Sequence, residues 1–411
     1  MSLIVMKFGG TSVGDIERIK NAAAKVAAEI KRGHKVAVVV SAMSGVTDQL
    51  IAYCRAISPR YDRREHDTVV ASGEQVTAGL MTMALHQRGL NARSWQGWQV
   101  RILTDSTHSF ARILDIEVGA LRRRLDDGEV SVIAGFQGVT EDGRVTTLGR
   151  GGGDTSAVAL AVALRADRCD IYTDVDGVYT TDPRIVKAAR KMGRVTYEEM
   201  LELASLGAKV LQVRSVELAM RYRMPVQVLS TFANEVGSDL PGTLVTEGSA
   251  EMETNPVTGI AYTRDEAKIT LVKVADKPGS AARVFVPLAR AGINIDMIVQ
   301  SASEDGRATD ITFTIGKADL DRACKVLEDE KAAIEFSHLQ AAANVTKISL
   351  VGIGMRSHAG VAATMFETLA DKGINIQVIE TSEISTSVLI ADEYTELALR
   401  SLHAAYGLDA A

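Results

Sequence analysis

A lysine followed by two glycines near the start of the chain could bind a phosphorylated anion. The segment KFGGTSV, Lys7 to Val13, ends an apolar run with these residues. Glycines let backbone amides approach phosphate oxygens, and a lysine supplies the charge that a transferring phosphoryl group needs. A glycine turn with a solvated lysine would have the same sequence, so this segment alone leaves both interpretations open.

A second glycine-rich segment, LGRGGGDTSAVALAVAL from Leu148 to Leu164, leads directly into an apolar helical pattern. Free amides at the start of a helix form an anion site, and Arg150 adds a planar guanidinium that suits a carboxylate. The helix is expected over Thr155 to Arg165. The chain contains no GxxxxGK[ST] segment, so the site is not a Walker loop.

A third segment, YTDVDGVYTTDPR from Tyr172 to Arg184, begins at the end of an expected strand. A loop at this place could bind the base, ribose and phosphates of a nucleotide. Asp-Gly turn chemistry also fits a plain surface hairpin. The aspartate spacing and the missing closing glutamate exclude an EF-hand.

These segments alternate with elements typical of an α/β fold. Strands are expected at Leu3 to Phe8, Lys35 to Ser41, Val130 to Phe136, Cys169 to Asp174 and Pro225 to Ser230. Helices are expected at Asp15 to Arg32, Val69 to Arg88, Thr155 to Arg165, Tyr197 to Leu206 and Lys209 to Tyr222. This order predicts a mostly parallel sheet covered on both faces, with ligands at the carboxyl ends of the strands.

The C-terminal part of the chain contains an internal repeat. The stretch beginning at Ile269 matches the stretch beginning at Ile348, and both contain a Gly-Ile-Asn triplet. Each copy has the βαββαβ order of a small α+β sandwich, but the second copy lacks its last strand, a place that Gly259 to Thr263 is expected to fill. The expected divisions are a catalytic domain at 1–245, a linker at 246–258 and two repeat domains at 259–341 and 342–411.

Composition narrows the classes of function. The 411 residues are 46% hydrophobic and 24% charged with 7 prolines, which is typical of a folded protein of more than one domain. The net charge of −6 comes without a basic stripe, so neither nucleic acid nor a membrane surface is an expected partner. We expect no export, because the start of the chain lacks a signal sequence and the longest apolar run, Ala157 to Leu164, is short.

The cysteines and histidines give no sign of a metal site. Cys54, Cys169 and Cys324 are widely spaced, as expected for reduced thiols in a cytoplasm, and are interpreted as small buried hydrophobic residues. The seven histidines form no HxxxH or HExxH pair. No metal centre built from protein ligands is therefore expected.

Seven motifs in order resemble the aspartokinase family. They are KFGGTSV, VSAMSGVTD, SGEQ, GFQG, TTLGRGGGDTSA, YTDVDGVYTTDPR and GAKVLQ, and the repeats resemble paired ACT domains, which bind free amino acids. The resemblance implies an amino-acid-kinase-type sheet followed by two ACT domains. It also implies ATP-dependent phosphorylation of the aspartate β-carboxylate to 4-phospho-L-aspartate, the first step of lysine, threonine and methionine biosynthesis.

The same resemblance gives roles to individual residues. Lys7 and Asp154 would be catalytic, and aspartate would contact Thr47, Glu74, Arg150, Gly151 and Gly153. ATP would contact Lys7, Phe8, Gly9, Gly10, Thr173, Asp174, Tyr179, Arg184, Lys209 and Val210. Asp174 could equally be a turn cap. Magnesium would be held mainly by ATP oxygens and water.

Physical chemistry agrees with these roles. The side-chain carboxylate of aspartate has a pKa near ~3.9 and is already an anion at neutral pH, so its phosphorylation needs no general base. It needs a cation for the α-carboxylate, an anion for the α-ammonium and a lysine at the γ-phosphate. Arg150, Glu74 and Lys7 provide this set.

One position departs from the family pattern. The family usually has GRGGSD where this chain has Gly153. The missing hydroxyl removes one possible neutral hydrogen bond, worth about 0.5–1.5 kcal/mol, so an altered Michaelis constant is expected rather than an inactive enzyme.

The repeats offer candidate effector contacts at helix starts and strand ends. In the first copy they are Asp276, Gly279, Ser280, Asn294, Asp296 and Gln300, and in the second Met355, Ser357, His358, Asn375, Thr381 and Glu383. Capped helices with Asn turn residues would look similar, and His358 is interpreted as a cap. The family resemblance predicts feedback inhibition by lysine with threonine through a two-state change.

Two further alternatives concern assembly and activity. The resemblance allows a homo-oligomer through the ACT domains, or an α2β2 assembly with a shorter chain started near Met252. The rival activities are a glutamate, acetylglutamate or uridylate kinase of the same fold, and a non-catalytic amino-acid sensor. Glu74, Arg150 and the paired repeats argue against the other kinases, and the retention of Lys7, Asp154 and Arg150 argues against a sensor.

Overall fold

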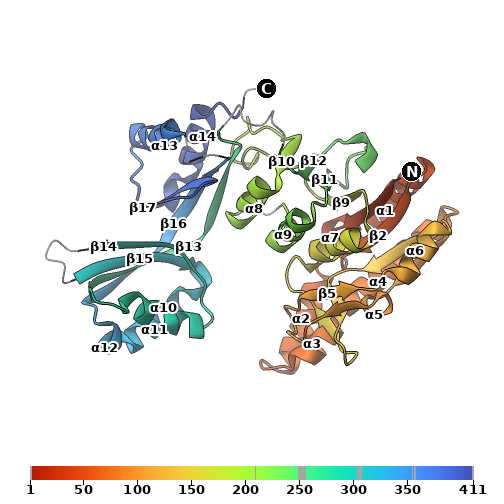
Figure 1. Cartoon of the computed structure of the whole chain (residues 1–411), viewed down its shortest axis with the longest axis horizontal. Helices are drawn as coiled ribbons and strands as arrows, with labels where there is room; N and C mark the ends of the chain where they lie inside the picture. Colours follow the sequence, from red (N-terminus) through yellow and green to blue (C-terminus); the bar gives the residue numbers. More distant parts are fainter. Residues whose placement is uncertain are drawn as a thin grey trace. The chain divides into compact units, whose positions relative to one another are not determined.

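The chain folds into two compact units (Figure 1). The computed structural model describes residues 2–208, 210–248, 256–302, 308–353, 355 and 358–409. Within these, the first unit comprises the chain up to Tyr179, Lys191–Ser205 and 210–248. The second comprises Thr180–Arg190, Leu206–Ala208 and the chain from 256 onward. Two short segments from the middle of the first part of the sequence therefore fold with the second unit.

The first unit is built on an eight-stranded sheet. Its strands in spatial order are β10 (Arg194–Thr196), β12 (Thr243–Thr246), β11 (Val226–Ser230), β9 (Arg168–Thr173), β1 (Leu3–Phe8), β2 (Lys35–Val40), β6 (Val130–Ala134) and β3 (Ala92–Trp95). Among these described strands, every pairing is parallel except that of β11 with β12. The predicted mostly parallel sheet is confirmed.

Helices flank this sheet in the first unit. They are α1 (Ile16–Lys31), α2 (Val46–Ile57), α3 (Arg63–Val70), α4 (Ser72–Gln87), α5 (Gly97–Val100), α6 (Gly119–Asp126), α7 (Gly152–Leu164), α8 (Tyr197–Ser205) and α9 (Val213–Tyr222), with short 3-10 turns at η1 (Gly10–Val13) and η2 (Gly237–Asp239). No helix within the described ranges is both long and apolar enough to cross a membrane.

Side chains along β1 point alternately to the hydrophobic core and to the opposite face of the sheet. Ile4, Met6 and Phe8 are buried in a cluster that also contains residues of α1 and α4. The intervening Lys7 points to the other face, where its ammonium pairs with Asp154 on α7. The central strands are buried along nearly their whole length, which explains their continuous apolar sequences.

The helix predicted over Val69 to Arg88 is wrong in detail, because the chain forms two helices, α3 and α4, that meet at Ala71. The Gln137 side-chain amide donates to the Ala71 carbonyl at 2.9 Å. Ala71 is both the C-cap residue of α3 and the N-cap residue of α4. A tertiary hydrogen bond therefore accompanies the break, and sequence periodicity cannot reveal it.

The first unit also contains a small second sheet. Its strands in order are β5 (Ile113–Ile116), β4 (Ile102–Thr104), β7 (Gln137–Val139) and β8 (Val145–Thr147). Strand β8 runs directly into the glycine segment that precedes α7. This sheet therefore helps to position the glycine segment.

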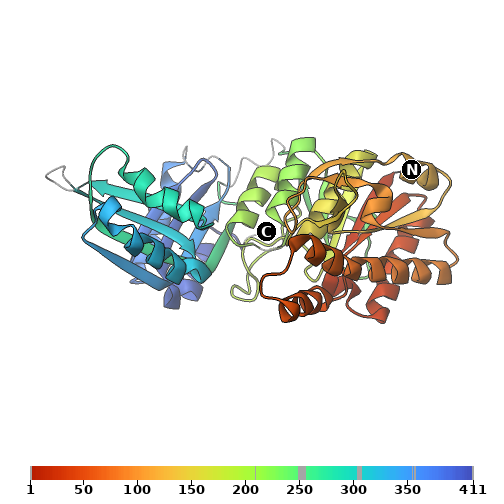
Figure 2. The ribbon, with the colours of Figure 1, turned by 90° about the horizontal axis from the view of Figure 1, so that it is seen from below.

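The second unit contains one six-stranded sheet. Its strands in order are β14 (Ile295–Ala302), β15 (Ala308–Gly316), β13 (Gly259–Ala275), β16 (His338–Val351), β18 (Ser385–Ala391) and β17 (Val378–Thr381). Its helices are α10 (Ser280–Arg290), α11 (Leu320–Asp329), α12 (Lys331–Ile334), α13 (Ala359–Asp371) and α14 (Thr395–Ala405), with 3-10 turns η4 (Lys317–Asp319) and η5 (Asp392–Tyr394). Figure 2 shows the helices beside these strands.

The two long central strands each serve both sequence repeats. The start of β13, Gly259 to Thr263, pairs with residues 347–351 of β16, while the later part pairs with residues 338–342. Each repeat thus has four strands, and each has its own core. Ile269, Val284 and Phe313 belong to one cluster, and Ile348 and Met365 belong to the other.

The segment from Thr180 to Arg190 is anchored in the second of these cores. Val186 is buried among side chains of the second repeat. The Thr180 carbonyl accepts from the Ile260 amide at 2.7 Å, and its hydroxyl lies 2.9 Å from His403 Nε2. Part of the predicted nucleotide loop therefore folds as a component of the second unit.

Core packing on α4 generates a stability prediction. Met81 is fully buried, whereas Met83 on the same helix is 65% exposed. We expect Met81→Ala to lower the unfolding free energy of the first unit by about 2–5 kcal/mol, because it leaves a cavity. Met83→Ala should change it by less than about 0.5 kcal/mol. Urea unfolding followed by tryptophan fluorescence tests this, since both tryptophans, Trp95 and Trp98, lie in the first unit. Equal effects of the two substitutions would contradict this account of the core.

Candidate active site

A pocket of about 920 Å³ opens in the first unit where β1, β2 and β9 end. The predicted site residues that line it are Lys7, Gly9, Gly10, Thr47, Glu74, Arg150, Gly151, Gly153, Asp154, Thr173, Asp174 and Val210. A neighbouring hollow of about 730 Å³ over α2 shares Asp48, Ile51, Arg55 and Arg150 with it. The pocket lies at the carboxyl edge of the sheet, as expected for a parallel α/β fold.

An ion pair between Lys7 and Asp154 forms the floor of the pocket. Lys7 Nζ lies 2.5 Å from Asp154 Oδ1, and each side chain is 10% exposed. Lys7 comes from the end of β1 and Asp154 from the first turn of α7. The helix N-terminus favours the carboxylate, and the carboxylate holds the ammonium in place.

The glycine segment positions the start of α7. Gly149 and Gly151 have φ angles of +79° and +77°, which only glycine adopts without strain. A Cβ atom at Gly151 would lie 2.0 Å from Gln212 Cγ. The helix begins at Gly152, three residues before the predicted start at Thr155. Asp154 is consequently a helical residue facing Lys7 and not part of the preceding loop.

The first glycine pair provides fewer free amides than the sequence suggests. The Gly9 amide donates to the Tyr172 carbonyl at 3.2 Å. Gly10 opens the 3-10 turn η1, whose first amides have no acceptor within the turn. A Cβ at Gly10 would lie 3.1 Å from the Ala42 carbonyl oxygen, so this position also needs a small residue. The backbone amides that remain free to donate to an anion are therefore those at the start of η1.

Glu74 is a buried carboxyl group with one unused oxygen. Its side chain lies on the first turn of α4 and the residue is 3% exposed. Oε1 accepts from the Ala42 amide at 3.0 Å, while Oε2 is buried without a hydrogen-bond partner. Burial raises the pKa of Glu74 to about 7, although the backbone hydrogen bonds oppose this rise. An orphaned buried oxygen of this kind fits a cationic ligand group.

Thr47, Arg150 and Gly153 surround the same space. Thr47 is half-buried in the first turn of α2, and Arg150 is exposed next to the glycine segment. A Cβ at Gly153 would lie 3.0 Å from Ser41 Oγ. The family usually has a serine at the position of Gly153. In this chain the Ser41 hydroxyl is the nearest group to the place where that serine side chain would begin.

Only some of the predicted nucleotide contacts line the pocket. Thr173 and Asp174 line the pocket and form a hydrogen bond of 3.1 Å with each other, and Val210 also lines it. Phe8 is fully buried and stacks on Tyr172. Tyr179 donates to Asp176, outside the pocket lining.

One other predicted nucleotide contact, Arg184, does not line this pocket. Arg184 belongs to the second unit, where it pairs with Asp182. Lys209 lies outside the described residues.

Several pocket residues escaped the sequence analysis. They are Ser41, Arg55, Tyr61, Arg63, His66, Ser109, Phe110, Phe136 and Gln212. Ser41 directly follows β2, so the rule that ligands bind at strand ends could have found it. Ser109 and Phe110 come from an irregular loop without a motif, and only tertiary structure brings them to the pocket.

No group of three histidine, cysteine, aspartate or glutamate side chains able to hold a metal ion occurs in the part of the chain that the structure describes. Asp154 and Asp174 nevertheless line the pocket. They could accept hydrogen bonds from water molecules around a nucleotide-bound cation.

The candidate effector contacts of the first repeat lie around α10 and β14. Gly279 is the N-cap residue of α10 with φ +93°, and the Ser280 hydroxyl donates to the Ala275 carbonyl at 2.6 Å. Asp276 and Asn294 are exposed before α10 and β14. On β14, Asp296 pairs with Lys347 at 2.5 Å, and Gln300 is exposed.

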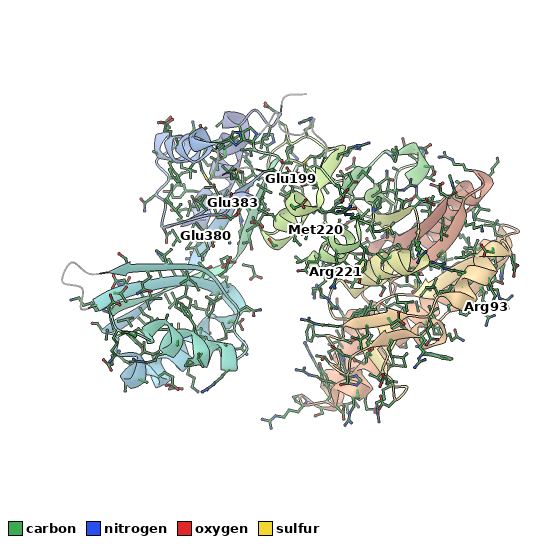
Figure 3. All side chains as sticks on the ribbon, in the orientation of Figure 1. Arg93, Glu199, Met220, Arg221, Glu380 and Glu383 are labelled. Atoms are coloured by element: carbon green, nitrogen blue, oxygen red, sulfur yellow. The ribbon has the colours of Figure 1, made fainter. Side chains whose placement is uncertain are left out.

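Those of the second repeat lie around α13 and β17. The Met355 amide donates to the Glu383 carbonyl at 3.0 Å, and His358 is the N-cap residue of α13. Asn375 lies between α13 and β17, and Thr381 ends β17. Figure 3 labels Glu383 with Glu380, both in this region. Ser357 and Met252 lie outside the described residues.

Comparison with known proteins identifies both units. The amino acid kinase family matches residues 2–230, and the ACT domain family matches residues 269–330 and 348–406. The chain is 53% identical over 411 residues to the aspartate kinase of Pseudomonas putida, covering 100% of this chain and 98% of that one. The chain belongs to the aspartate kinase family. It transfers a phosphoryl group to aspartate and carries ACT domains of the kind that regulate such kinases.

Solved structures of aspartate kinases have the same fold. E. coli aspartokinase III in complex with aspartate and ADP, in the R-state, matches with a TM-score of 0.81 at 26% identity, covering 98% of this chain and 99% of that one. The same enzyme with lysine and aspartate, in the T-state, matches with a TM-score of 0.78 at 27% identity and the same coverage. The predicted family and fold class are confirmed, and the glutamate-type kinase and sensor alternatives are set aside.

The raised pKa of Glu74 predicts a pH dependence for this aspartate kinase. The Glu74 carboxyl group loses its proton near neutral pH, and only the charged form would attract a substrate ammonium. The KM for aspartate should therefore rise about 10-fold from about pH 8 to about pH 6. Glu74→Gln should give a high KM that no longer varies with pH in this range. The exposed Glu65→Gln is the matched control. A pH-dependent KM that persists in Glu74→Gln would contradict this assignment.

Proposed function

We propose that the pocket of the first unit aligns MgATP with aspartate for direct transfer of the γ-phosphoryl group. The observation that carries this proposal is the buried Lys7–Asp154 pair beside the unpartnered Oε2 of Glu74. A cation for the phosphoryl group and an anion for the amino group thus lie in one pocket. These are the charges that the two substrates require.

Aspartate is oriented by three groups in this proposal. Arg150 binds its α-carboxylate, Glu74 its α-ammonium, and Thr47 contributes a hydroxyl. Gly151 and Gly153 also line the pocket, and in this proposal their backbone contacts the substrate. The β-carboxylate then points toward Lys7 as an ionised nucleophile.

The chemical step needs no proton transfer. An oxygen of the β-carboxylate forms a bond to the γ-phosphorus, the bond from that phosphorus to the β,γ-bridging oxygen breaks, and ADP leaves with the electron pair. Lys7 stabilises the charge that develops on the transferred group, and Asp154 keeps the ammonium in position.

ATP enters as its Mg²⁺ complex, with the metal held by phosphate oxygens and water. In this proposal Gly9 and Gly10 of the pocket, with the end of β1 at Phe8, contact the phosphates, and Thr173, Asp174 and Val210 contact the nucleoside. Tyr179, Arg184 and Lys209 remain proposed contacts, because the family pattern places them there.

Lysine with threonine is proposed as the effector pair. The E. coli aspartokinase III structure in the T-state contains lysine, which supports an amino-acid effector for this chain. The effectors would bind at the starts of α10 and α13 and along β14 and β17, and would shift a two-state equilibrium of the enzyme.

The domain boundaries predicted from the sequence are retained as a proposal, with Gly259 to Thr263 contributing to the second ACT domain. The pairing of this five-residue segment with residues 347–351 of β16 supports this assignment. We also propose assembly through the ACT domains, as a homo-oligomer or with a shorter chain started near Met252, and residence in the cytoplasm. Neither nucleic acid nor membrane is part of the proposal.

Removing the Lys7 ammonium tests the proposed mechanism. Lys7→Ala should lower kcat at least about 100-fold, because one charged contact to the transition state is lost. Steady-state assays with saturating aspartate and ATP measure this. Lys20→Ala is the control, since the Lys20 side chain on α1 is 43% exposed and forms an ion pair only with the nearby Glu17 in the described structure. Turnover that survives in Lys7→Ala would refute the mechanism.

Effector titration tests the regulatory proposal. Lysine and threonine together should inhibit more strongly than either alone, and Gln300→Ala on β14 should weaken this inhibition several-fold. Gln340→Ala makes the same chemical change at an exposed position of β16 and should leave it unaltered. An enzyme whose activity responds to neither amino acid would show that the proposed effectors are wrong.

A further inference from the structure

A buried carboxylate, Asp67 on α3, lies behind the wall of the active-site pocket. The residue is fully buried and does not line the pocket itself, although its neighbours His66, Ser109 and Thr147 do. Neither the family motifs nor the predicted substrate contacts include it. Its surroundings nevertheless connect it to the aspartate subsite.

Six contacts converge on the two oxygens of Asp67. Oδ2 accepts from the backbone amides of Ser109 at 2.9 Å and Thr147 at 3.0 Å, and lies 3.0 Å from His108 Nδ1. Oδ1 accepts from the Thr147 hydroxyl at 2.7 Å and the Ser109 hydroxyl at 3.3 Å, and lies 3.3 Å from His66 Nδ1. The carboxylate thus ties α3 to two separate pieces of backbone.

One of these pieces is a strained loop. Ser109 has a φ angle of +71°, a conformation that non-glycine residues rarely adopt. Such a residue persists only where its surroundings hold it, and Asp67 binds both its amide and its hydroxyl. The next residue, Phe110, lines the pocket. A Cβ atom at Gly149 would lie 2.8 Å from the Phe110 ring, so the loop packs closely on the glycine segment.

The other piece is the end of β8, which leads into that glycine segment. Thr147 is three residues before Arg150. The Ala111 amide donates to the Thr147 carbonyl at 3.0 Å, joining the two pieces directly. From the opposite side, the Arg214 guanidinium donates to the carbonyls of Leu148 at 2.7 Å and Ala111 at 3.0 Å. Asp67 on α3 and Arg214 on α9 therefore both bind the place where the Ser109 loop meets the end of β8.

The position of Asp67 in the chain gives this junction a function. Asp67 lies on α3, and Glu74 lies on the first turn of the adjoining α4. The Asp67 hydrogen bonds thus fix the segment that carries Arg150 relative to the helix pair that carries Glu74. We infer that Asp67 is a positioning residue for aspartate, setting the spacing between Arg150 and Glu74. This inference depends on the substrate contacts proposed above.

The spacing matters because Arg150 and Glu74 hold the two charged groups of one α-carbon. A displacement of about 1 Å in such a constellation can cost up to about 100-fold in rate. ATP is held by other elements, the ends of β1 and β9. Loss of Asp67 should therefore weaken aspartate binding selectively.

A purely structural role for Asp67 makes a different prediction. A buried carboxylate removed from its donors leaves amides and hydroxyls unsatisfied, which lowers stability whatever the function. A loss of stability alone would not change the KM for one substrate more than the KM for the other. The ratio of the aspartate KM to the ATP KM therefore distinguishes a structural role from a positioning role.

The decisive variants are Asp67→Ala and Asp67→Asn. The alanine variant should raise the KM for aspartate about 10-fold or more, with the KM for ATP changed less than about 2-fold. The asparagine variant should restore the KM for aspartate to within about 3-fold of the parent. Its carbonyl can accept the two backbone amides at Oδ2, and its amino group can donate to the Thr147 and Ser109 hydroxyls, which rotate to accept.

Asp62→Ala is the matched control for the stability of α3. Asp62 is the N-cap residue of this helix and accepts from the Arg64 amide at 2.8 Å, but in the described structure it makes no hydrogen bond to the Ser109 loop or to β8. Its removal weakens the same helix. It should leave both KM values within about 2-fold of the parent. If Asp67→Ala does not fold, Thr147→Val, which removes one hydroxyl donor to Asp67, should raise the aspartate KM about 3-fold.

The outcomes separate this inference from the proposed substrate contacts. A selective rise in the aspartate KM with rescue by Asp67→Asn supports the positioning role. Equal changes in both KM values, an unchanged aspartate KM in folded Asp67→Ala, or the same pattern in Asp62→Ala would overturn it. If Glu74→Gln alters the aspartate KM while Asp67→Ala does not, only the positioning role fails. If neither does, the substrate contacts themselves are wrong.

Discussion

The Lys7–Asp154 ion pair is the interaction on which the active site depends. Two opposite charges, each only 10% exposed, meet where a buried strand ends and a buried helix begins. Burying either charge alone would be strongly unfavourable, so each fixes the other. The ammonium is consequently held at a defined point. In the proposed mechanism, a phosphoryl group that approaches this point would meet a cation already in place, which is the condition for electrostatic catalysis.

Two buried carboxyl groups near this pair have opposite environments. Asp67 is surrounded by amide and hydroxyl donors, so its hydrogen-bonding capacity is used within the protein. Glu74 accepts from the Ala42 amide at Oε1 but has one orphaned oxygen, Oε2, and burial raises its pKa to about 7. The first group therefore organises backbone, whereas the second retains capacity for a ligand. Burial alone does not distinguish such residues, but a count of their donors does.

The second unit shows how two repeats become one structure. Strands β13 and β16 each run through both repeats, so the repeats share one sheet but keep separate cores. Lys347, whose side chain is only 4% exposed, pairs with Asp296 at 2.5 Å and lies 3.7 Å from Glu380. These partners come from β14 of the first repeat and β17 of the second. A change at either repeat would act on the same continuous strands, as a two-state regulatory element requires.

The sequence by itself determined the central strands of the large sheet, the family and the main charged groups of this protein. Buried parallel strands are continuous apolar runs, so β1 was predicted at its observed bounds. Lys7 and Arg150 were found because glycine-rich segments place them at a strand end and ahead of a helix, and Glu74 was found through the family resemblance. Local chemistry encodes such features within a few residues.

Only the tertiary structure decided the break between α3 and α4, the early start of α7 and the cluster around Asp67. The break at Ala71 accompanies a hydrogen bond from Gln137, and Asp67 meets Ser109 and Thr147 across 42 and 80 residues of chain. The segment from Thr180 to Arg190 likewise joins the second unit through contacts with distant residues such as His403. Periodicity and motifs describe neighbours along the chain. Hydrogen bonds between distant segments depend on how the whole sheet places its loops, and no local pattern contains that information.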